Sequence, residues 1–228
     1  MNADPHRPHA GIIVIWNDIL PAARDDFLEW HSREHIPERV ATPGFCSGQR
    51  WFGDSASPAY LTIYETAGID VLTSAPYLAR LNDPTPWTRR AVAAFRNTSR
   101  AAGSLVWQSR SSCALGGNIL TARVVEPVDD PQSLIGRWGT SILPAIAAAA
   151  GVARVRLTLT AASASQINTA ERKVRVGDMQ EPSMAILVEG FASPAALRAG
   201  FAQATADEPL LRQARIDLYA LQFELRCA

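Results

Sequence analysis

The chain has 228 residues, 47% of them hydrophobic and 19% charged, and its 22 Lys and Arg side chains balance 22 Asp and Glu. This length accommodates one large domain or two small ones with a proper core, and the lack of a basic surplus argues against a nucleic-acid partner. Three cysteines (Cys46, Cys113 and Cys227) have neither disulfide-framework nor metal-finger spacing, and no window approaches the roughly 18–20 apolar residues of a membrane span. We therefore expect a cytoplasmic protein without a membrane partner.

The first half of the chain is expected to cover residues 11–112, after a polar, proline-containing and disordered tail at residues 1–10. A β-branched run opens this half, and alternation of apolar residues marks the strands that follow. Its expected order is strand–helix–strand–strand–helix–strand. The predicted strands are 11–16, 44–52, 59–65 and 103–108, and the predicted helical stretches are 22–30, 69–81 with an interruption at Pro76, and 86–95.

The second half, residues 113–228, is predicted to repeat that order in degenerate form. Trp30 and Pro37 are echoed by Trp138 and Pro144, and each pair is followed by a glycine that opens a strand. The predicted strands are 118–125, 152–160, 184–191 and 216–225, and the predicted helices are 133–150 and 195–204.

The main mismatch between the halves is a polar insertion at residues 162–182, where the first half has a tight turn. Loops of this length are usually functional lids or disordered excursions, so we expect a flap.

The order strand–helix–strand–strand–helix–strand is that of the ferredoxin-like unit, which leaves one face of its sheet uncovered. Two such units in one chain bury those faces against each other. The sequence therefore predicts an α+β protein in which two tandem ferredoxin-like repeats form a single-chain, pseudo-twofold α+β barrel. One chain is sufficient to complete it, and a homodimer remains possible.

Several motifs of the first half match one known group. An acidic helix ends in Trp30-His31 and His35-Ile36-Pro37, Thr42-Pro43-Gly44-Phe45 follows, and residues 60–65 and 82–97 complete the match. This part of the chain resembles the dimeric α+β barrel superfamily, and within it the EthD-like and related uncharacterised proteins. The resemblance implies the barrel fold. The superfamily includes monooxygenases, isomerases, polyketide cyclases, decarboxylases and haem-binding enzymes, so the fold leaves the reaction open.

The strongest candidates for catalysis are His31 and His35. Residues four apart lie on one face of a helix, so both imidazoles are expected to face the same small volume. Histidine has an unperturbed pKa near neutrality and is therefore suited to proton transfer or metal binding. The plainer alternative is a pair of half-exposed histidines bonded to local glutamates.

Pro37 is expected to break or kink the helix just after His35, because it has no N–H to donate. A helix that ended there would favour a protonated His35 through its dipole, and Glu34 or Glu38 could orient either imidazole. The second half has no such residues after Trp138, which indicates one working pocket and one that keeps only the scaffold.

Metal and cofactor sites are weaker hypotheses. His31-Ser32-Arg33-Glu34-His35 matches the H-x-x-E-H pattern of certain zinc peptidases, but the proline and the lack of a further histidine argue against zinc. An iron triad of the two histidines and a glutamate is a still weaker alternative. No metal site is predicted. Haem held by one histidine stays open as an alternative cofactor.

The expected substrate-binding residues are Arg39, Trp51, Tyr60, Tyr64 and Trp87. Tyrosine can donate to a carbonyl or phenol oxygen and tryptophan offers a flat apolar wall, while Trp87 is placed to close over the pocket. Arg39 could hold an acidic group, or pair with Glu38 or Glu65. All could equally be ordinary sheet or helix residues.

These residues favour a small cofactor-independent enzyme of the isomerase, cyclase or decarboxylase type. It would use histidine acid–base chemistry on a small aromatic or polyketide-like substrate. Two alternatives stay open: a haem-binding or cofactor-free monooxygenase, and a non-catalytic ligand-binding barrel.

Overall fold

The computed structural model describes residues 10–109 and 116–227. The predicted tail therefore lies, apart from Ala10, outside the described residues, as does Cys113. None of the described helices is both long and apolar enough to cross a membrane.

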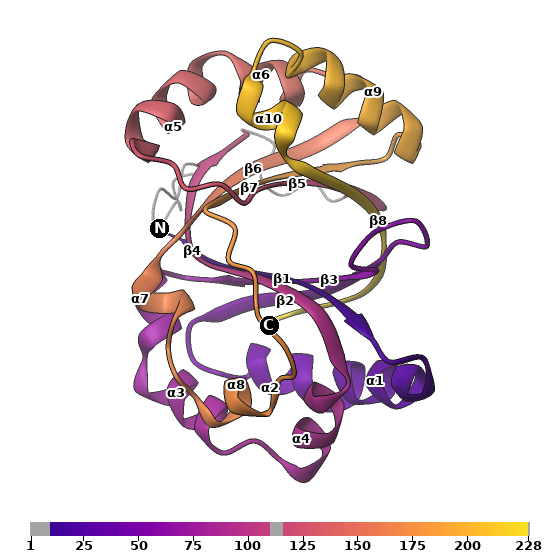
Figure 1. The fold of residues 1–228 in the computed structure, drawn as a ribbon, viewed down its shortest axis with the longest axis vertical. Helices are drawn as coiled ribbons and strands as arrows, with labels where there is room; N and C mark the ends of the chain where they lie inside the picture. Colours follow the sequence, from indigo (N-terminus) through magenta and orange to yellow (C-terminus); the bar gives the residue numbers. More distant parts are fainter. Residues whose placement is uncertain (1–9, 110–115, 228) are drawn as a thin grey trace.

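Eight antiparallel strands close into one barrel, as Figure 1 shows, in the order β1-β3-β2-β8-β5-β7-β6-β4. Each half supplies four neighbouring strands with the same internal order, fourth–first–third–second, and that order belongs to the ferredoxin-like unit. The strands are β1 (Gly11–Ile19), β2 (Phe45–Phe52), β3 (Tyr60–Thr66), β4 (Phe95–Gln108), β5 (Asn118–Val124), β6 (Val152–Thr160), β7 (Met184–Gly190) and β8 (Arg215–Arg226).

The two halves meet at two seams, β2 with β8 and β4 with β6. At these seams Trp51 pairs with Leu221, and Leu105 with Thr158. Because both seams are hydrogen-bonded, one chain closes the sheet, as the single-chain α+β barrel predicted.

Helices cover the barrel in two separate layers (Figure 1). The lower layer contains α1 (Arg24–Trp30), the π-helical turn η2 (His31–His35), α2 (Ile36–Val40), η3 (Ile69–Thr73), α3 (Ala75–Asn82) and α4 (Pro86–Ala93), with η1 (Pro21–Ala23) before α1. The upper layer contains α5 (Pro131–Thr140), α6 (Ile142–Ala147), α9 (Pro194–Ala204) and α10 (Pro209–Gln213).

The insertion at residues 162–182 belongs to the second half in sequence but lies with the lower layer in space. It forms α7 (Ala162–Ser165) and α8 (Ala170–Val174). Figure 1 shows both beside α3, and α8 contacts α3 and α4 while α7 contacts β4 and η3. A segment of the second half thus covers the first.

Alternation along the strands divides the buried side chains between the inside of the barrel and the helical layers. The inner cluster draws on strands of both halves and includes Trp16, Trp51 and Ile119. The upper layer packs on one apolar cluster around Trp138, and the lower layer on two clusters.

Two predicted boundaries were wrong. The strand expected at 103–108 begins at Phe95, because residues 95–104 of β4 pair with β1, whereas the pairing with β6 covers residues 103–108. The helix expected at 133–150 is interrupted at Ser141, since the ring of Pro144 would clash with the carbonyl of Thr140 in a continuous helix.

Candidate functional site

The histidine pair lies in a π-helical turn, and this corrects the predicted break at Pro37. The helix continues through Pro37 to Val40, and the irregularity precedes the proline: the N–H of Ile36 donates to the carbonyl of His31, five residues back. Pro37 then occupies the first turn of α2, where a missing N–H is tolerated. Single π turns inside helices are frequent at functional sites.

Side chains from the sheet stabilise this turn. The carbonyl of Leu28 accepts hydrogen bonds from Ser32 Oγ at 2.9 Å and from Arg50 Nη1 at 3.2 Å, and Arg50 Nη1 also donates to Ser32 Oγ at 2.9 Å. Trp30 Nε1 donates to Thr88 Oγ1 at 3.1 Å, which ties the turn to α4. The position of the histidines is therefore fixed from two sides.

Both imidazoles are buried: His31 is 2% exposed and His35 6%. Their rings stack 5.6 Å apart between centroids, and His35 also stacks on Trp30 at 4.3 Å. Neither Nδ1 has a hydrogen-bond partner among the described residues. The pair is therefore not the half-exposed, glutamate-bonded arrangement that was the plainer alternative.

Burial keeps both histidines neutral. Desolvation lowers the pKa of His31 well below its ordinary value of 6.5, and the charges of His35, Arg50 and Arg39 lower it further. Desolvation likewise lowers the pKa of His35, with Arg39 and Arg175 adding to the effect. The expected protonated His35 at a helix end is thus wrong, because the helix does not end there and burial disfavours the charged ring.

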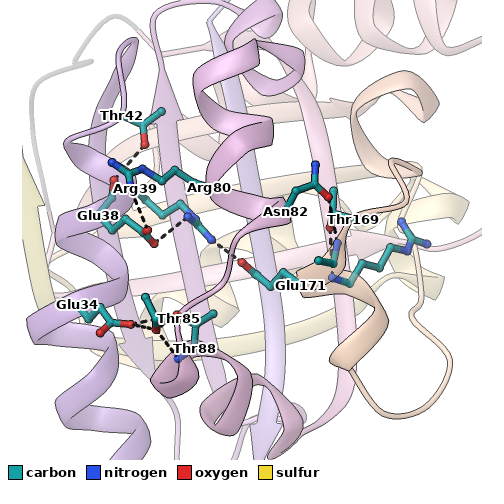
Figure 2. Close-up of polar contacts among 12 residues, drawn as sticks. Glu34, Glu38, Arg39, Thr42, Arg80, Asn82, Thr85, Thr88, Thr169 and Glu171 are labelled. Atoms are coloured by element: carbon teal, nitrogen blue, oxygen red, sulfur yellow. Dashed lines mark hydrogen bonds and ion pairs between the residues drawn. The ribbon is translucent and has the colours of Figure 1, made fainter.

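Glu34 and Glu38 do not orient the imidazoles. The Oε1 atom of Glu34 accepts from Thr85 Oγ1 at 2.6 Å and from Thr88 Oγ1 at 3.1 Å, and Glu38 Oε2 lies 3.0 Å from Arg39 Nη1 (Figure 2). The glutamate of the H-x-x-E-H pattern therefore turns away from both histidines.

Two adjoining cavities lie between the sheet and the lower helical layer. The larger has a volume of about 550 Å³, counting its open mouth, and the smaller about 250 Å³. His35 and Tyr64 line both, whereas His31 lines only the smaller one. Both cavities therefore border at least one member of the histidine pair.

Tyr64 is a second buried polar group at these cavities. Its hydroxyl has no partner among the described residues, and its ring lies 6.3 Å from that of His35. Burial raises the pKa of Tyr64 far above its ordinary value of 10.0, so the hydroxyl stays protonated and can donate a hydrogen bond.

The 162–182 segment closes the larger cavity through charged side chains. Arg39 Nη2 lies 2.5 Å from Glu171 Oε2 (Figure 2), and Arg175 Nη2 lies 3.2 Å from the other carboxylate oxygen. Desolvation raises the pKa of Glu171, but Arg39 and Arg175 outweigh it, so the net pKa is lowered and the carboxylate is charged. Figure 2 also shows Asn82 against the start of α8, where its Oδ1 accepts from the N–H of Ala170 at 3.2 Å.

The structure brings His31, His35, Arg39 and Tyr64 together and places three other predicted residues elsewhere. Trp51 faces the inside of the barrel, on the opposite side of β2 from the cavities. Tyr60 accepts a hydrogen bond from Arg24 Nε at 3.1 Å, and Trp87 donates one to Asp26 at 3.0 Å, both in the separate cluster around Phe27. Glu65, the other partner considered for Arg39, pairs with Arg154 and Arg156 instead.

Sequence reasoning missed the larger part of the cavity wall. Tyr77 comes from α3 and Arg100 from β4, and the 162–182 segment supplies Glu171, Arg172, Arg175 and Met179. The polar composition of that insertion was a signal of function, but nothing in it indicated which half of the barrel it would cover.

No family model and no curated protein matches this sequence. Solved structures do match over nearly the whole chain. An anthrone oxidase-like protein aligns with TM-score 0.61 and 12% identity over 98% of this chain and 95% of its own. A chlorite dismutase of Candidatus Nitrospira defluvii aligns with TM-score 0.55 and 7% identity (95% and 92%). A haem-binding protein of Thermus thermophilus aligns with TM-score 0.51 and 11% identity (94% and 92%). At such identities the likeness establishes the α+β barrel fold and nothing finer.

The residues of the site fit a haem in donor type. His35 lines the cavity and its Nδ1 has no hydrogen-bond partner among the described residues, and arginines of the same cavity could pair with carboxylates. An axial histidine normally donates its other ring N–H to a carbonyl or carboxylate. No described residue supplies that acceptor to either histidine.

Proposed function

We propose that the protein is a cofactor-independent oxygenase or oxidase that removes a proton from an anthrone-like or phenolic aromatic substrate and lets the resulting anion react with O₂. The observation that carries the proposal is His35, a buried and neutral imidazole at the wall of the larger cavity whose Nδ1 has no hydrogen-bond partner among the described residues. The names of two structural neighbours, anthrone oxidase-like protein and putative monooxygenase, support oxidation over the isomerase, cyclase or decarboxylase reaction that the sequence favoured.

His35 would be the base. A base must be unprotonated before it acts, and the lowered pKa keeps this imidazole neutral at physiological pH. The same low pKa makes His35 a weak base when no substrate is bound. The imidazolium that forms is stabilised only when an anion forms beside it, which restricts proton removal to a bound substrate.

Tyr64 would stabilise that anion. Removing a proton from a carbon conjugated with a carbonyl places negative charge on the oxygen, and a neutral hydroxyl in a dry site is an effective donor to it. Tyr64 has such a hydroxyl, unbonded, on the cavity that His35 lines. His31 stacks on His35 and is assigned a positioning role.

The oxidation balances with O₂ as the oxidant. The C–H bond gives its proton to His35 and its electron pair to the substrate anion. The anion forms a C–O bond with O₂, and the resulting peroxide anion takes the proton back from His35 to give a hydroperoxide. Loss of water then leaves a carbonyl, so that CH₂ and O₂ become C=O and H₂O.

Oxygen uptake and quinone formation with anthrone as substrate test the proposal. Replacing a general base typically lowers the rate about 10²–10⁴-fold, and we expect that loss in kcat for His35→Gln. Tyr64→Phe should lower kcat, while Tyr60→Phe, on the same face of the same strand but outside the cavities, serves as the matched control. Unchanged turnover in His35→Gln would refute the base assignment.

Haem binding is the second candidate, favoured by the unbonded imidazole and by the haem-binding neighbour. His35 would then hold the iron and cavity arginines the carboxylates, and the bound group would supply oxygen activation. Titration with haemin should produce a Soret band that His35→Gln abolishes. Oxidation by a preparation without that band would favour the main proposal.

Three finer expectations stay part of this proposal: membership of the EthD-like group, a cytoplasmic location, and action on a small molecule by a chain that suffices as a monomer, with a homodimer possible. The closed barrel of one chain is consistent with the last of these.

A further inference from the structure

The larger cavity carries more positive than negative charge. Four arginines line it: Arg39, Arg100, Arg172 and Arg175. Three carboxylates pair with them, because Glu38 and Glu171 contact Arg39, Glu171 contacts Arg175, and Glu181 contacts Arg172. One positive charge is therefore left without a counter-charge among these groups.

Arg100 carries that excess. Its Nη1 donates only to the backbone carbonyls of Ala164 and Ser165, at 3.5 and 3.3 Å. No carboxylate of the described residues forms an ion pair with it. The other cavity arginines each have at least one such partner.

Arg175 has an unused donor in the same region. Its Nη1 atom is buried without a hydrogen-bond partner among the described residues, although the side chain as a whole is paired with Glu171. Burial lowers the pKa of this guanidinium and the charge of Arg100 lowers it further, against the opposing effect of Glu171. Leaving a buried donor unbonded costs about 1–3 kcal/mol, which an acceptor on a ligand would recover.

The rest of the wall selects the remainder of the ligand. Ile13, Ile15, Leu81, Ala164, Ile167 and Met179 make it largely apolar. A planar carboxylate matches the geometry of a guanidinium fork, and a ring system matches the apolar surface.

We propose that the substrate of this cavity is an aromatic acid whose carboxylate binds between Arg100 and Arg175. The inference deepens the proposed function, since it names the class of substrate for the same site. Arg100 comes from β4 and Arg175 from the segment that crosses from the second half, so the acid group would join the two parts of the cavity.

The probes are anthraquinone-2-carboxylate and its uncharged carboxamide, and binding to the full chain is measured by calorimetry. Charge-assisted hydrogen bonds contribute about 1.5–3 kcal/mol, so we expect the acid to bind roughly 10–100-fold more tightly than the amide. Arg100→Gln should remove most of that preference, because the acid loses a charge-assisted hydrogen bond and the amide loses at most a neutral one. It is the primary variant because Arg100 holds no ion pair that the fold would lose.

Arg175→Gln is expected to have the same effect, provided that its circular dichroism spectrum matches that of the wild type. Arg172→Gln is the matched control, because Arg172 already pairs with Glu181 and donates to the carbonyl of Ser165. Equal affinity for acid and amide, or a preference that survives Arg100→Gln, would overturn the inference.

The binding assay also separates this inference from the proposed function. Selective binding of the acid with no oxygen uptake by any anthrone would leave the anion site standing and remove the oxidase. Oxidation of neutral anthrones, with no preference for the acid in binding, would leave the oxidase standing and remove the anion site.

Discussion

The two helical layers of the barrel are built on one plan but differ in what they bury. Beneath the upper layer, Trp138, Leu143 and Ile146 join a fully apolar cluster. Beneath the lower layer, the corresponding region holds His31, His35 and Arg39, all nearly inaccessible to water. One layer therefore gains stability from apolar packing, while the other buries polar groups around a cavity.

A single residue accounts for part of this difference. Pro37 follows Trp30 by seven positions and Pro144 follows Trp138 by six, whereas each proline precedes its glycine by seven. Gly44 and Gly151 both have positive φ, 89° and 79°, so the two segments end alike. The extra residue falls in the π turn, which places two imidazoles at the cavities.

The largest expected effect concerns the ion pair that fastens the 162–182 segment to the lower layer. Glu171→Ala leaves Arg39 and Arg175 without this buried partner, and breaking a buried pair typically costs about 3–5 kcal/mol. Urea unfolding measures the loss. Glu181→Ala is the control. Glu181 is more exposed than Glu171 and pairs with Arg172, so the expected cost is about 0–1 kcal/mol. Equal costs would show that the segment is not held by Glu171.

The apolar layer should be more sensitive to truncation than the polar one. Leu143→Ala creates a void in a dense cluster and should lower the free energy of unfolding by about 2–5 kcal/mol without changing turnover. His35→Ala should cost less, because His35 already borders a cavity and has an unbonded nitrogen. The free energy of unfolding and kcat are measured for both variants. A larger loss of stability in His35→Ala than in Leu143→Ala would contradict the prediction.

Deleting Arg33 shortens the spacing between Trp30 and Pro37 to that between Trp138 and Pro144. Arg33 is exposed and pairs only with Glu29 at the surface, so the main consequence is loss of the π turn. A displacement of about 1 Å at a reacting group can cost about 10² in rate, and we expect at least that loss in kcat.

The converse change, insertion of Ala after Gly139, alters the second half and should leave turnover unchanged. If the deletion variant keeps wild-type kcat, the π turn does not position the catalytic groups.

The smallest effect is on pH dependence. In the unfolded chain His31 and His35 bind protons near pH 6.5, whereas the folded protein holds their pKa values well below that. The unfolded state therefore binds more protons as the pH falls below about 6.5, and the free energy of unfolding decreases in that range. Tm measured from pH 7 to pH 5 should fall, and the double variant His31→Leu/His35→Leu should flatten the decrease. An equal slope in both proteins would show that the imidazoles are charged in the fold.

Sequence patterns located the strands because their signal is local. Alternation and β-branched runs gave 152–160 without error and most other strands to within a few residues. They missed the start of β4, since its first residues, Phe95 to Ala102, are polar in places and form a strand through pairing with β1 and a bridge from Ser99 to Gln180.

The histidines, Arg39 and Tyr64 were identified from residue type and spacing, and they lie together. Trp51 was misplaced because alternation identifies two faces of a strand but not which one faces the helices. Tyr60 and Trp87 lie on the face of the sheet that the helices cover, but at the other end of that face from the cavities. Which end a residue reaches depends on where α1 and α4 cross the sheet.

Residue patterns alone were enough to predict the barrel, the two-part order of its elements and the histidine pair, because periodicity is a local property and each uncovered sheet face must be buried. The protonation state of the histidines and the closure of the cavity by Glu171 and Arg175 could be learned only from the folded molecule. Each depends on burial or on contact between residues far apart in the chain, such as the 132 positions between Arg39 and Glu171, and no local pattern records such a contact.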